Sequence, residues 1–387
     1  MKTVIRNAKL YDGQDTVMEN ASIVFDEKGI IQVSSKELTG DRMIDATGKT
    51  VMPGLFDCHV HLGITADPYG GEVATGALAA WQAHKFLEYG ITTVRCCGSR
   101  YNADITLREL IDKRIVEAAR IVASGNALTI TGGHAWNMSH ECDTVEEIVK
   151  ATRKQLKAGA DQIKLFATGG MGTKASIPNM PQFTMEEMRA AVGEAEKRNA
   201  LTCAHATGLD GARKAIAAGV RSIEHTQLDR DTTRMMKEKG AYYCSTIVTR
   251  YSIVHCKDPK YAWLRDKAQP GDVERMLDAI RYCKEYGVTL CAGTDAGFNE
   301  AITPVGKSLH QELQLYTQAG LSPLEALRTA TYNGAKLLRL EEKTGALRPG
   351  LAADVIVIDG DPTRNIQDVS KVIMTFREGR LLWEKRQ

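Results

Sequence analysis

The sequence predicts a (β/α)8 barrel that carries a small β-sandwich built from both ends of the chain. Three observations predict it: β-rich runs at both termini, eight short apolar runs in the long middle segment, and helical patterns between most of those runs. A chain of 387 residues fits one barrel of about 250 residues plus such an appendage. We expect residues 1–52 and 345–387 to form the two parts of the sandwich and residues 53–344 to form the barrel.

The terminal segments read as strands because β-branched and aromatic residues alternate there with turn residues. The N-terminal runs are 3–13, 21–34 and 43–54, and the C-terminal runs are 353–362 and 371–384. A Pro-Gly break at Pro349-Gly350 precedes the C-terminal pair. Because strand edges need partners, we expect the two terminal sets to share one small domain.

The middle of the chain alternates between apolar runs and helical patterns. The apolar runs lie at 51–58, 91–97, 121–123, 163–167, 201–204, around 223, at 242–248 and at 288–292. The clearest helix begins at Thr184, where Thr184 and Glu187 have the spacing of a capping box. Another helical run, 77–89, ends at Gly90, a typical C-terminal glycine. The segment therefore holds eight predicted strands that alternate with helices, and eight is the number of strands that closes such a barrel.

Composition excludes several classes of function. Hydrophobic residues make up 43% and charged residues 25% of the chain, which is typical of a folded globular protein and excludes a disordered or fibrous one. The net charge of +2 gives no support for a nucleic-acid or anionic-membrane partner. No stretch reaches the roughly 18 apolar residues of a membrane span, and the N-terminus lacks the apolar core of a signal peptide. The nine cysteines form no CxxC pair, so we expect reduced thiols and a cytoplasmic location.

The first barrel strand ends in the motif Asp57-Cys58-His59-Val60-His61. Residues i and i+2 of a strand point to the same side, so both imidazoles should face the barrel mouth together. A pair of histidines at this spacing also arises by chance. Whether this pair has a function therefore depends on which residues lie at the ends of the other strands.

Four further strands end in ligand-forming residues: Lys164, His205, His225 and Asp295. Barrel enzymes place their catalytic groups at the carboxyl ends of the strands. A single buried histidine is more often an ordinary core residue, whereas a lysine inside an apolar strand is costly unless it is paired. Together with the histidine pair, the four residues predict one shared site.

At these residues the sequence resembles the amidohydrolase superfamily. The resemblance covers essentially the whole chain and is strongest in the run from Pro53 to His61, in the four strand-end residues above, and in the run from Gly345 to Asp354. The branch it resembles most contains prolidase-like and imidazolonepropionase-related metal-dependent hydrolases. Two departures from the family pattern alter the pocket rim: Cys96-Cys97 follows the second strand, and Thr226 follows His225. We interpret the two adjacent cysteines as small apolar filler rather than a redox or metal pair.

The resemblance implies a site for two divalent metal ions, with zinc expected. It implies that His59, His61 and Asp295 bind the more buried ion and that His205 and His225 bind the outer one. Lys164, converted by CO2 to a carbamate, and a hydroxide would bridge the two ions. The implied reaction is hydrolysis of a C–N bond, in which Asp295 acts first as a base and then as an acid.

Substrate contacts are predicted at the barrel mouth. The resemblance makes His134, in the run from Thr131, a candidate for contacting the scissile carbonyl or a carboxylate of the substrate. His140 is the alternative candidate for the same contact. A carboxylate also calls for a cationic or hydroxyl partner, and the candidates are Tyr243, Arg250 and Tyr251. The histidines could equally be solvated loop residues, the tyrosines could serve packing, and Arg250 could be a surface charge.

The function expected from these residues is hydrolysis of a dipeptide, Xaa-Pro or Xaa-Xaa, or of an N-acyl amino acid. The partner would be a small molecule with a free carboxylate, and the family also allows a homo-oligomer. One alternative is a mononuclear cyclic amidase or deaminase in which Lys164 is structural. The other is a non-catalytic barrel protein.

Overall fold

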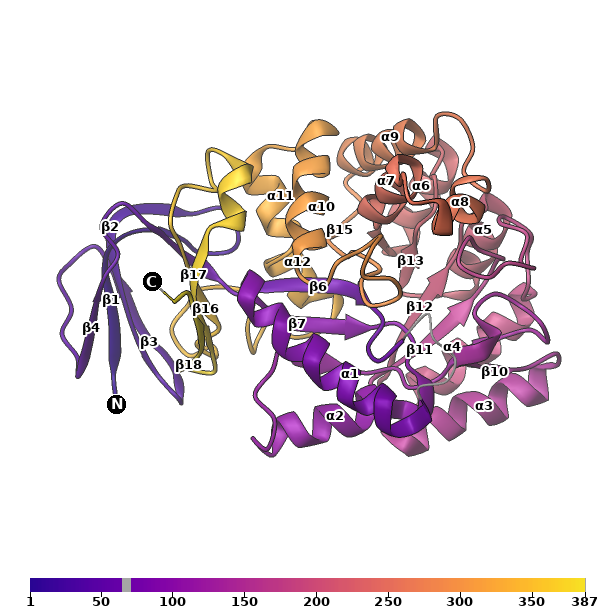
Figure 1. Cartoon of the computed structure of the whole chain (residues 1–387), viewed down its shortest axis with the longest axis horizontal. Helices are drawn as coiled ribbons and strands as arrows, with labels where there is room; N and C mark the ends of the chain where they lie inside the picture. Colours follow the sequence, from indigo (N-terminus) through magenta and orange to yellow (C-terminus); the bar gives the residue numbers. More distant parts are fainter. Residues whose placement is uncertain (65–70, 387) are drawn as a thin grey trace.

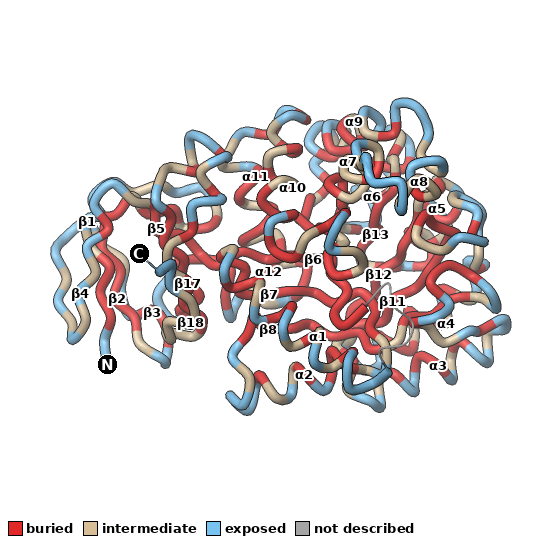
Figure 2. Tube along the Cα trace, in the orientation of Figure 1, coloured by how far each residue is buried: buried red, intermediate tan, exposed pale blue. Residues whose placement is uncertain are grey.

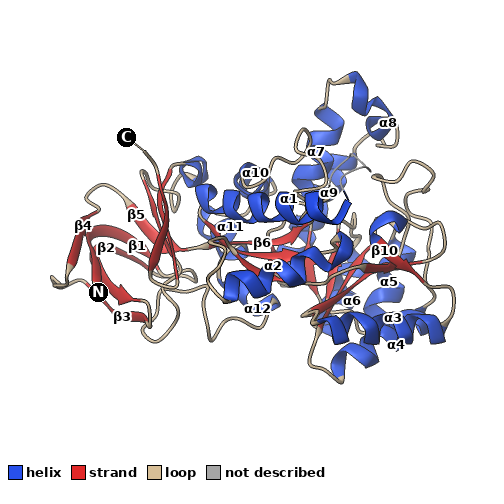
Figure 3. Ribbon diagram, turned by 60° about the horizontal axis from the view of Figure 1, so that its bottom comes forward, coloured by secondary structure: helices blue, strands red, loops and turns tan. Residues whose placement is uncertain are grey.

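The computed structural model describes residues 1–64 and 71–386, and its strands fall into two groups. One group forms a sheet at one end of the molecule, where both chain termini lie, and the other forms a barrel surrounded by helices (Figures 1 and 3). The predicted fold class, a (β/α)8 barrel with a terminal β-sandwich, is confirmed.

The terminal sheet is built from both ends of the chain. In Figure 1 its indigo N-terminal strands and yellow C-terminal strands lie beside each other. Strand β5 pairs with β1 on one side and with β16 on the other, which joins the two parts. Its strands are β1 (Thr3–Tyr11), β2 (Val17–Asp26), β3 (Gly29–Ser34), β4 (Arg42–Asp45), β5 (Thr50–Pro53), β16 (Val355–Ile358), β17 (Val372–Arg377) and β18 (Arg380–Glu384).

The barrel strands run parallel to one another. They are β6 (Leu55–Val60), β7 (Ile91–Cys96), β8 (Arg120–Val122), β11 (Gln162–Phe166), β12 (Leu201–His205), β13 (Ser222–Glu224), β14 (Tyr242–Cys244) and β15 (Leu290–Cys291). Two short strands, β9 (Ala127–Thr129) and β10 (Ser139–Glu141), extend the sheet beside β11. The chain closes the barrel where the segment after β15 bonds to β6, through a parallel bridge between Val60 and Ala296.

Helices cover the barrel and leave its strands among the most deeply buried parts of the chain (Figures 2 and 3). The α-helices are α1 (Gly71–Lys85), α2 (Ala103–Asp112), α3 (Val145–Ala158), α4 (Met185–Glu196), α5 (Leu209–Ala218), α6 (Arg230–Lys239), α7 (Ile247–His255), α8 (Ala262–Arg265), α9 (Asp272–Tyr286), α10 (Lys307–Gln318), α11 (Pro323–Thr329) and α12 (Tyr332–Leu337). The short 3-10 helices are η1 (Phe86–Tyr89), η2 (Arg100–Asn102), η3 (Trp136–Met138), η4 (Pro259–Tyr261) and η5 (Ile366–Ser370).

Two local predictions about helix ends are confirmed. Thr184 caps α4 and forms the full capping box with Glu187. Gly90 ends the helical run through η1 in the left-handed conformation, with φ of 73°. The strand β7 begins directly after Gly90, so this glycine marks the change from helix to barrel strand.

Two predicted strands differ from the structure. The run 51–58 is not one strand: β5 belongs to the terminal sheet and β6 to the barrel, and Gly54 separates them. A side chain at Gly54 would meet the Thr92 side chain at 2.2 Å, so only glycine fits this crossing. The run 242–248 is also shorter than predicted, because the strand ends at Cys244 and α7 begins at Ile247.

Among the described residues, none of the helices combines the length and apolar character needed to cross a bilayer. All nine cysteines are free thiols, and Cys96 and Cys97 are fully buried.

Candidate active site

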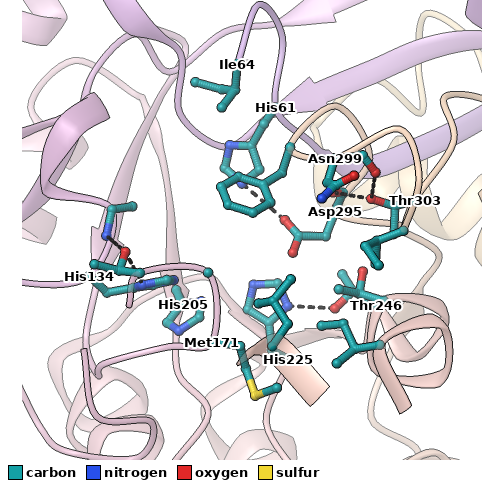
Figure 4. A pocket seen from close by; sticks show the side chains of 18 of the residues that line it. His61, Ile64, His134, Met171, His205, His225, Thr246, Asp295, Asn299 and Thr303 are labelled. Carbon is teal, nitrogen blue, oxygen red and sulfur yellow. Dashed lines mark hydrogen bonds and ion pairs between the residues drawn. The ribbon is translucent and has the colours of Figure 1, made fainter. Parts of the chain in front are cut away.

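A cavity of about 730 Å³ lies at the carboxyl ends of the barrel strands. Five of the six residues predicted as metal ligands line it, and the sixth, His59, lies directly behind them, with its ring centroid 4.6 Å from that of His225. Figure 4 shows four of these side chains converging from different elements. Those shown are His61 after β6, His205 at the end of β12, His225 after β13 and Asp295 after β15.

The histidine pair of β6 faces Asp295. The Asp295 Oδ1 atom lies 3.2 Å from His61 Nε2 and 3.5 Å from His59 Nε2. His59, His225 and Asp295 each offer a ligand atom, and these atoms lie within 4.8 Å of one another. The predicted same-side arrangement of His59 and His61 therefore brings both rings to one carboxylate.

Asp57 fixes the strand that carries Asp295. The Thr294 hydroxyl donates to Asp57 at 2.6 Å and the Thr294 N–H donates at 3.1 Å. The Asp295 N–H donates to the His59 carbonyl at 2.7 Å. Asp295 itself has a positive φ of 59°, an uncommon conformation for a residue other than glycine. These bonds hold that conformation and keep the carboxylate opposite the histidines.

Each of the four histidines predicted as metal ligands has one ring nitrogen occupied by a partner from the protein. The pairs are His59 Nδ1 with Glu224 at 2.8 Å, His61 Nδ1 with the Gly98 carbonyl at 3.0 Å, His205 Nε2 with the Gly169 carbonyl at 3.2 Å, and His225 Nδ1 with the Thr246 hydroxyl at 2.6 Å. The other ring nitrogen is then left for a ligand. Metal-binding histidines are usually held in this way.

Burial controls the charge of the site. It lowers the pKa of His205 and His225 well below the ordinary histidine value, so both rings are neutral at pH 7. Burial acts to raise the pKa of Asp295, but the hydrogen bond with His61 and the nearby charges of His59, His61 and Lys164 together outweigh it and lower that pKa below the usual range. Neutral imidazoles beside an ionised carboxylate are the donors that zinc and similar ions prefer.

Lys164 is fully buried among these groups. Its Nζ atom lies 3.3 Å from His59 Nε2, and no carboxylate of the described residues lies within 4.0 Å of it. An isolated ammonium in such a place is costly. A chemical modification that removes the positive charge of this amine would remove that cost.

The remaining predicted residues do not all reach the cavity. His134 lines it, with Nδ1 3.0 Å from the Thr173 hydroxyl and its ring 4.6 Å from that of His205. His140 does not line it, and its Nε2 atom lies 2.7 Å from the Gln155 amide nitrogen.

Of the three residues predicted around the seventh strand, one lines the cavity and two do not. The Tyr243 side chain is fully buried away from the cavity lining and donates to the Thr226 carbonyl. Arg250 lines the cavity but lies on α7, where its Nη1 atom is 2.6 Å from Asp272. Tyr251, also on α7, stacks on His255 with ring centroids 4.2 Å apart.

Several cavity residues have no counterpart in the sequence predictions. They are the basic residues Arg100, Lys174 and Lys260 and the aromatic residues Trp136, Tyr261, Trp263 and Phe298. Arg100 lies shortly after the end of β7 at Cys96, so its position was a usable signal. The others lie in loops and short helices, and no periodic pattern in the sequence predicts where such segments lie in the fold.

A closed parallel barrel with this donor set at its strand ends defines a metal-dependent hydrolase. Comparison with known proteins agrees. The sequence profile of the amidohydrolase family matches residues 50–382, so the chain belongs to that family.

Known relatives and structures resemble the chain over most of its length. Ochratoxinase from Aspergillus niger is 29% identical, with 98% of this chain and 86% of the relative covered. A crystal structure of a Xaa-Pro dipeptidase with methionine bound in its active site is 32% identical, covers both chains fully and has a TM-score of 0.89. A prolidase complexed with N-methylphosphonate-L-proline is 27% identical, again over both full chains, with a TM-score of 0.88. The predicted family is therefore confirmed.

We expect Lys164→Met to stabilise the metal-free protein. The substitution keeps the length of the side chain and removes a buried charge, which should add roughly 1–3 kcal/mol to the free energy of unfolding. Thermal unfolding with a chelator present measures this. Lys174→Met, at an exposed lysine on the cavity wall, is the control and should change little. A less stable Lys164→Met protein would contradict the account of the buried amine.

Proposed function

We propose that the chain hydrolyses the amide C–N bond of a dipeptide, Xaa-Pro or Xaa-Xaa, or of an N-acyl amino acid, using two divalent metal ions. The observation that carries the proposal is the convergence of four histidines, one lysine and one aspartate from five strand ends. Zinc is the expected metal because imidazole and carboxylate donors suit it.

The ligands divide naturally between two ions. His59, His61 and Asp295 would hold one of them, since the Nε2 atoms of both histidines lie within 3.5 Å of Asp295 Oδ1. His205 and His225, whose ring centroids are 4.7 Å apart, would hold the other. A carbamate formed on Lys164 from CO2 would have an oxygen for each. The burial of Lys164 without a carboxylate partner among the described residues supports this, because an unpaired ammonium is costly in such a place and a carbamate between two cations would not carry that cost.

When bound, the metal ions make hydroxide available at neutral pH and polarise the scissile carbonyl. In this proposal Asp295 accepts the proton of the attacking water and delivers it to the leaving nitrogen. His134 is neutral, since burial lowers its pKa to about 3, so it can donate a hydrogen bond to the substrate without carrying charge. His134 is buried and 23% of the Asp295 side chain is exposed, so the barrel walls limit competing water around these groups.

The charge of the cavity favours an anionic substrate. Among the described residues, five basic side chains line it, and Asp295 is the one acidic residue that does. The basic residues are Arg100, Lys164, Lys174, Arg250 and Lys260. Arg250 is paired with Asp272, which leaves Arg100, Lys174 and Lys260 as the better candidates for a substrate carboxylate.

The relatives support the same substrate class. A dipeptidase with methionine bound and a prolidase with a proline analogue bound share this chain's fold over its full length. Methionine and proline both carry a carboxylate on the carbon atom that bears the amine nitrogen. The cavity of about 730 Å³ also has room for a larger acyl group than a simple dipeptide presents.

Paired substrates test the proposal. We expect metal-loaded protein to hydrolyse dipeptides or N-acyl amino acids and to lose at least about tenfold in kcat/KM on the matching C-terminal carboxamides, because a charged hydrogen bond is lost. Equal rates on acid and carboxamide would contradict carboxylate recognition. Two metal ions per chain, with activity that depends on bicarbonate during reconstitution, would separate this reading from a mononuclear deaminase or cyclic amidase.

Asp295→Asn should abolish turnover while much of the metal stays bound. The amide keeps one ligand oxygen but cannot accept and return a proton, so we expect kcat to fall by about 10²–10⁴-fold. Steady-state rates and metal content measured on the same preparation check this. Near-normal turnover would remove Asp295 from the proton-transfer role.

Two histidines of one loop give a matched pair of variants. His134 lines the cavity and His140 does not, so His134→Asn should lower kcat/KM by at least about tenfold and His140→Asn should leave it nearly unchanged. The two histidines lie close together in the chain, so the second variant controls for general damage to this segment. The reverse pattern would assign the substrate contact to His140.

A further inference from the structure

A buried ion pair lies directly beneath the cavity, and the activity proposed above gives it no task. Arg95, on β7, and Glu224, on β13, are both almost completely buried, and Arg95 Nη2 lies 2.8 Å from both Glu224 oxygens. We propose that Glu224 is a positioning residue that holds the metal ligand His59, with Arg95 and Ser222 fixing the carboxylate. This inference rests on the proposed metal-dependent function.

Every oxygen of the Glu224 carboxylate is used. Oε1 accepts from Arg95 Nη2 at 2.8 Å and from the Ser222 hydroxyl at 2.5 Å. Oε2 accepts from the same arginine nitrogen and from His59 Nδ1, each at 2.8 Å. Arg95 in turn donates to the Ser222 hydroxyl at 2.7 Å and to the Cys58 carbonyl, one residue before His59. The carboxylate therefore has a single available position.

This arrangement determines which nitrogen of His59 faces the metal. An ionised carboxylate can only accept hydrogen bonds, so His59 must carry its proton on Nδ1. Nε2, which lies 3.3 Å from Lys164 Nζ and 3.5 Å from Asp295 Oδ1, is then the nitrogen that would coordinate the ion. The ring cannot turn over without breaking a charged hydrogen bond inside the barrel.

His59 is distinguished from the other three ligand histidines by this partner. His61 and His205 bond to backbone carbonyls, and His225 bonds to the hydroxyl of Thr246. Only a carboxylate adds a full negative charge, which makes the imidazole a stronger donor to a metal ion. His59 is also the most buried of the four, with no exposed surface. Glu224 should therefore contribute more to metal affinity than any of the neutral partners.

The alternative is that Arg95 and Glu224 merely fill the barrel. The chain contains a comparable pair elsewhere: Arg120 Nη1 lies 2.6 Å from Asp354, and both side chains are buried. Asp354 also accepts from the Thr344 hydroxyl and the Glu378 N–H, and none of these partners is a candidate ligand. Breaking this pair has a similar folding cost and no direct connection to His59, so it serves as the control.

The experiment compares Glu224→Gln with Asp354→Asn in the full chain. Affinity for Zn²⁺ is measured by competition with a chromophoric chelator, and the visible spectrum of the Co²⁺-loaded protein reports ligand geometry. Circular dichroism of the metal-free proteins reports folding. We expect Glu224→Gln to weaken metal affinity by about 10–100-fold and to alter the cobalt spectrum. Asp354→Asn should lower thermal stability and leave both metal readouts within about twofold of the unchanged protein.

Ser222→Ala is the second variant, because it loosens the carboxylate without uncovering a buried charge. It should weaken Zn²⁺ binding in the same direction as Glu224→Gln and to a smaller extent, even if Glu224→Gln does not fold. Unchanged metal affinity in the folded Glu224 or Ser222 variant, or equal weakening in Asp354→Asn, would overturn the inference. Failure of the unchanged protein to bind Zn²⁺ at all would instead overturn the proposed function.

Discussion

The joint between β6 and the segment after β15 is the contact on which the rest of the site depends. There the first and last barrel strands meet, and the Asp57 carboxylate accepts two hydrogen bonds from Thr294. One residue further on, the Asp295 N–H bonds to the His59 carbonyl. The bonds that close the barrel are thus the same bonds that set Asp295 against the histidine pair. A shift of register at this joint would separate ligands that are far apart in the sequence.

Much of this arrangement was predictable because strand geometry is local. The i, i+2 spacing of His59 and His61 places both rings on one side, and the strand-end positions of Lys164, His205, His225 and Asp295 follow from the barrel rule. The capping box at Thr184 and the glycine at Gly90 depend on neighbouring residues alone. All eight predicted barrel strands have a counterpart in the structure, with differences at their ends.

Features set by contacts between distant elements were not predictable. A strand can present Tyr243 inward or outward, and only packing decides, so the tyrosine faces the core instead of the cavity. Arg250 was assigned to the vicinity of a strand, but the chain turns into α7 after Cys244. The bond between Glu224 and His59 joins residues on β13 and β6, and no local pattern indicates it. The split of 51–58 likewise depends on Thr92 crowding Gly54.

The terminal sheet has a consequence for how the chain matures. Strand β5 lies between β1 and β16, so one of its edges is covered only by a strand that is translated after the whole barrel. During synthesis the N-terminal strands leave the ribosome first and present an open edge, which is prone to associate with other chains. The nascent chain therefore exposes this edge of β5 until β16 has been synthesised, so the edge is shielded only after all the barrel strands have emerged.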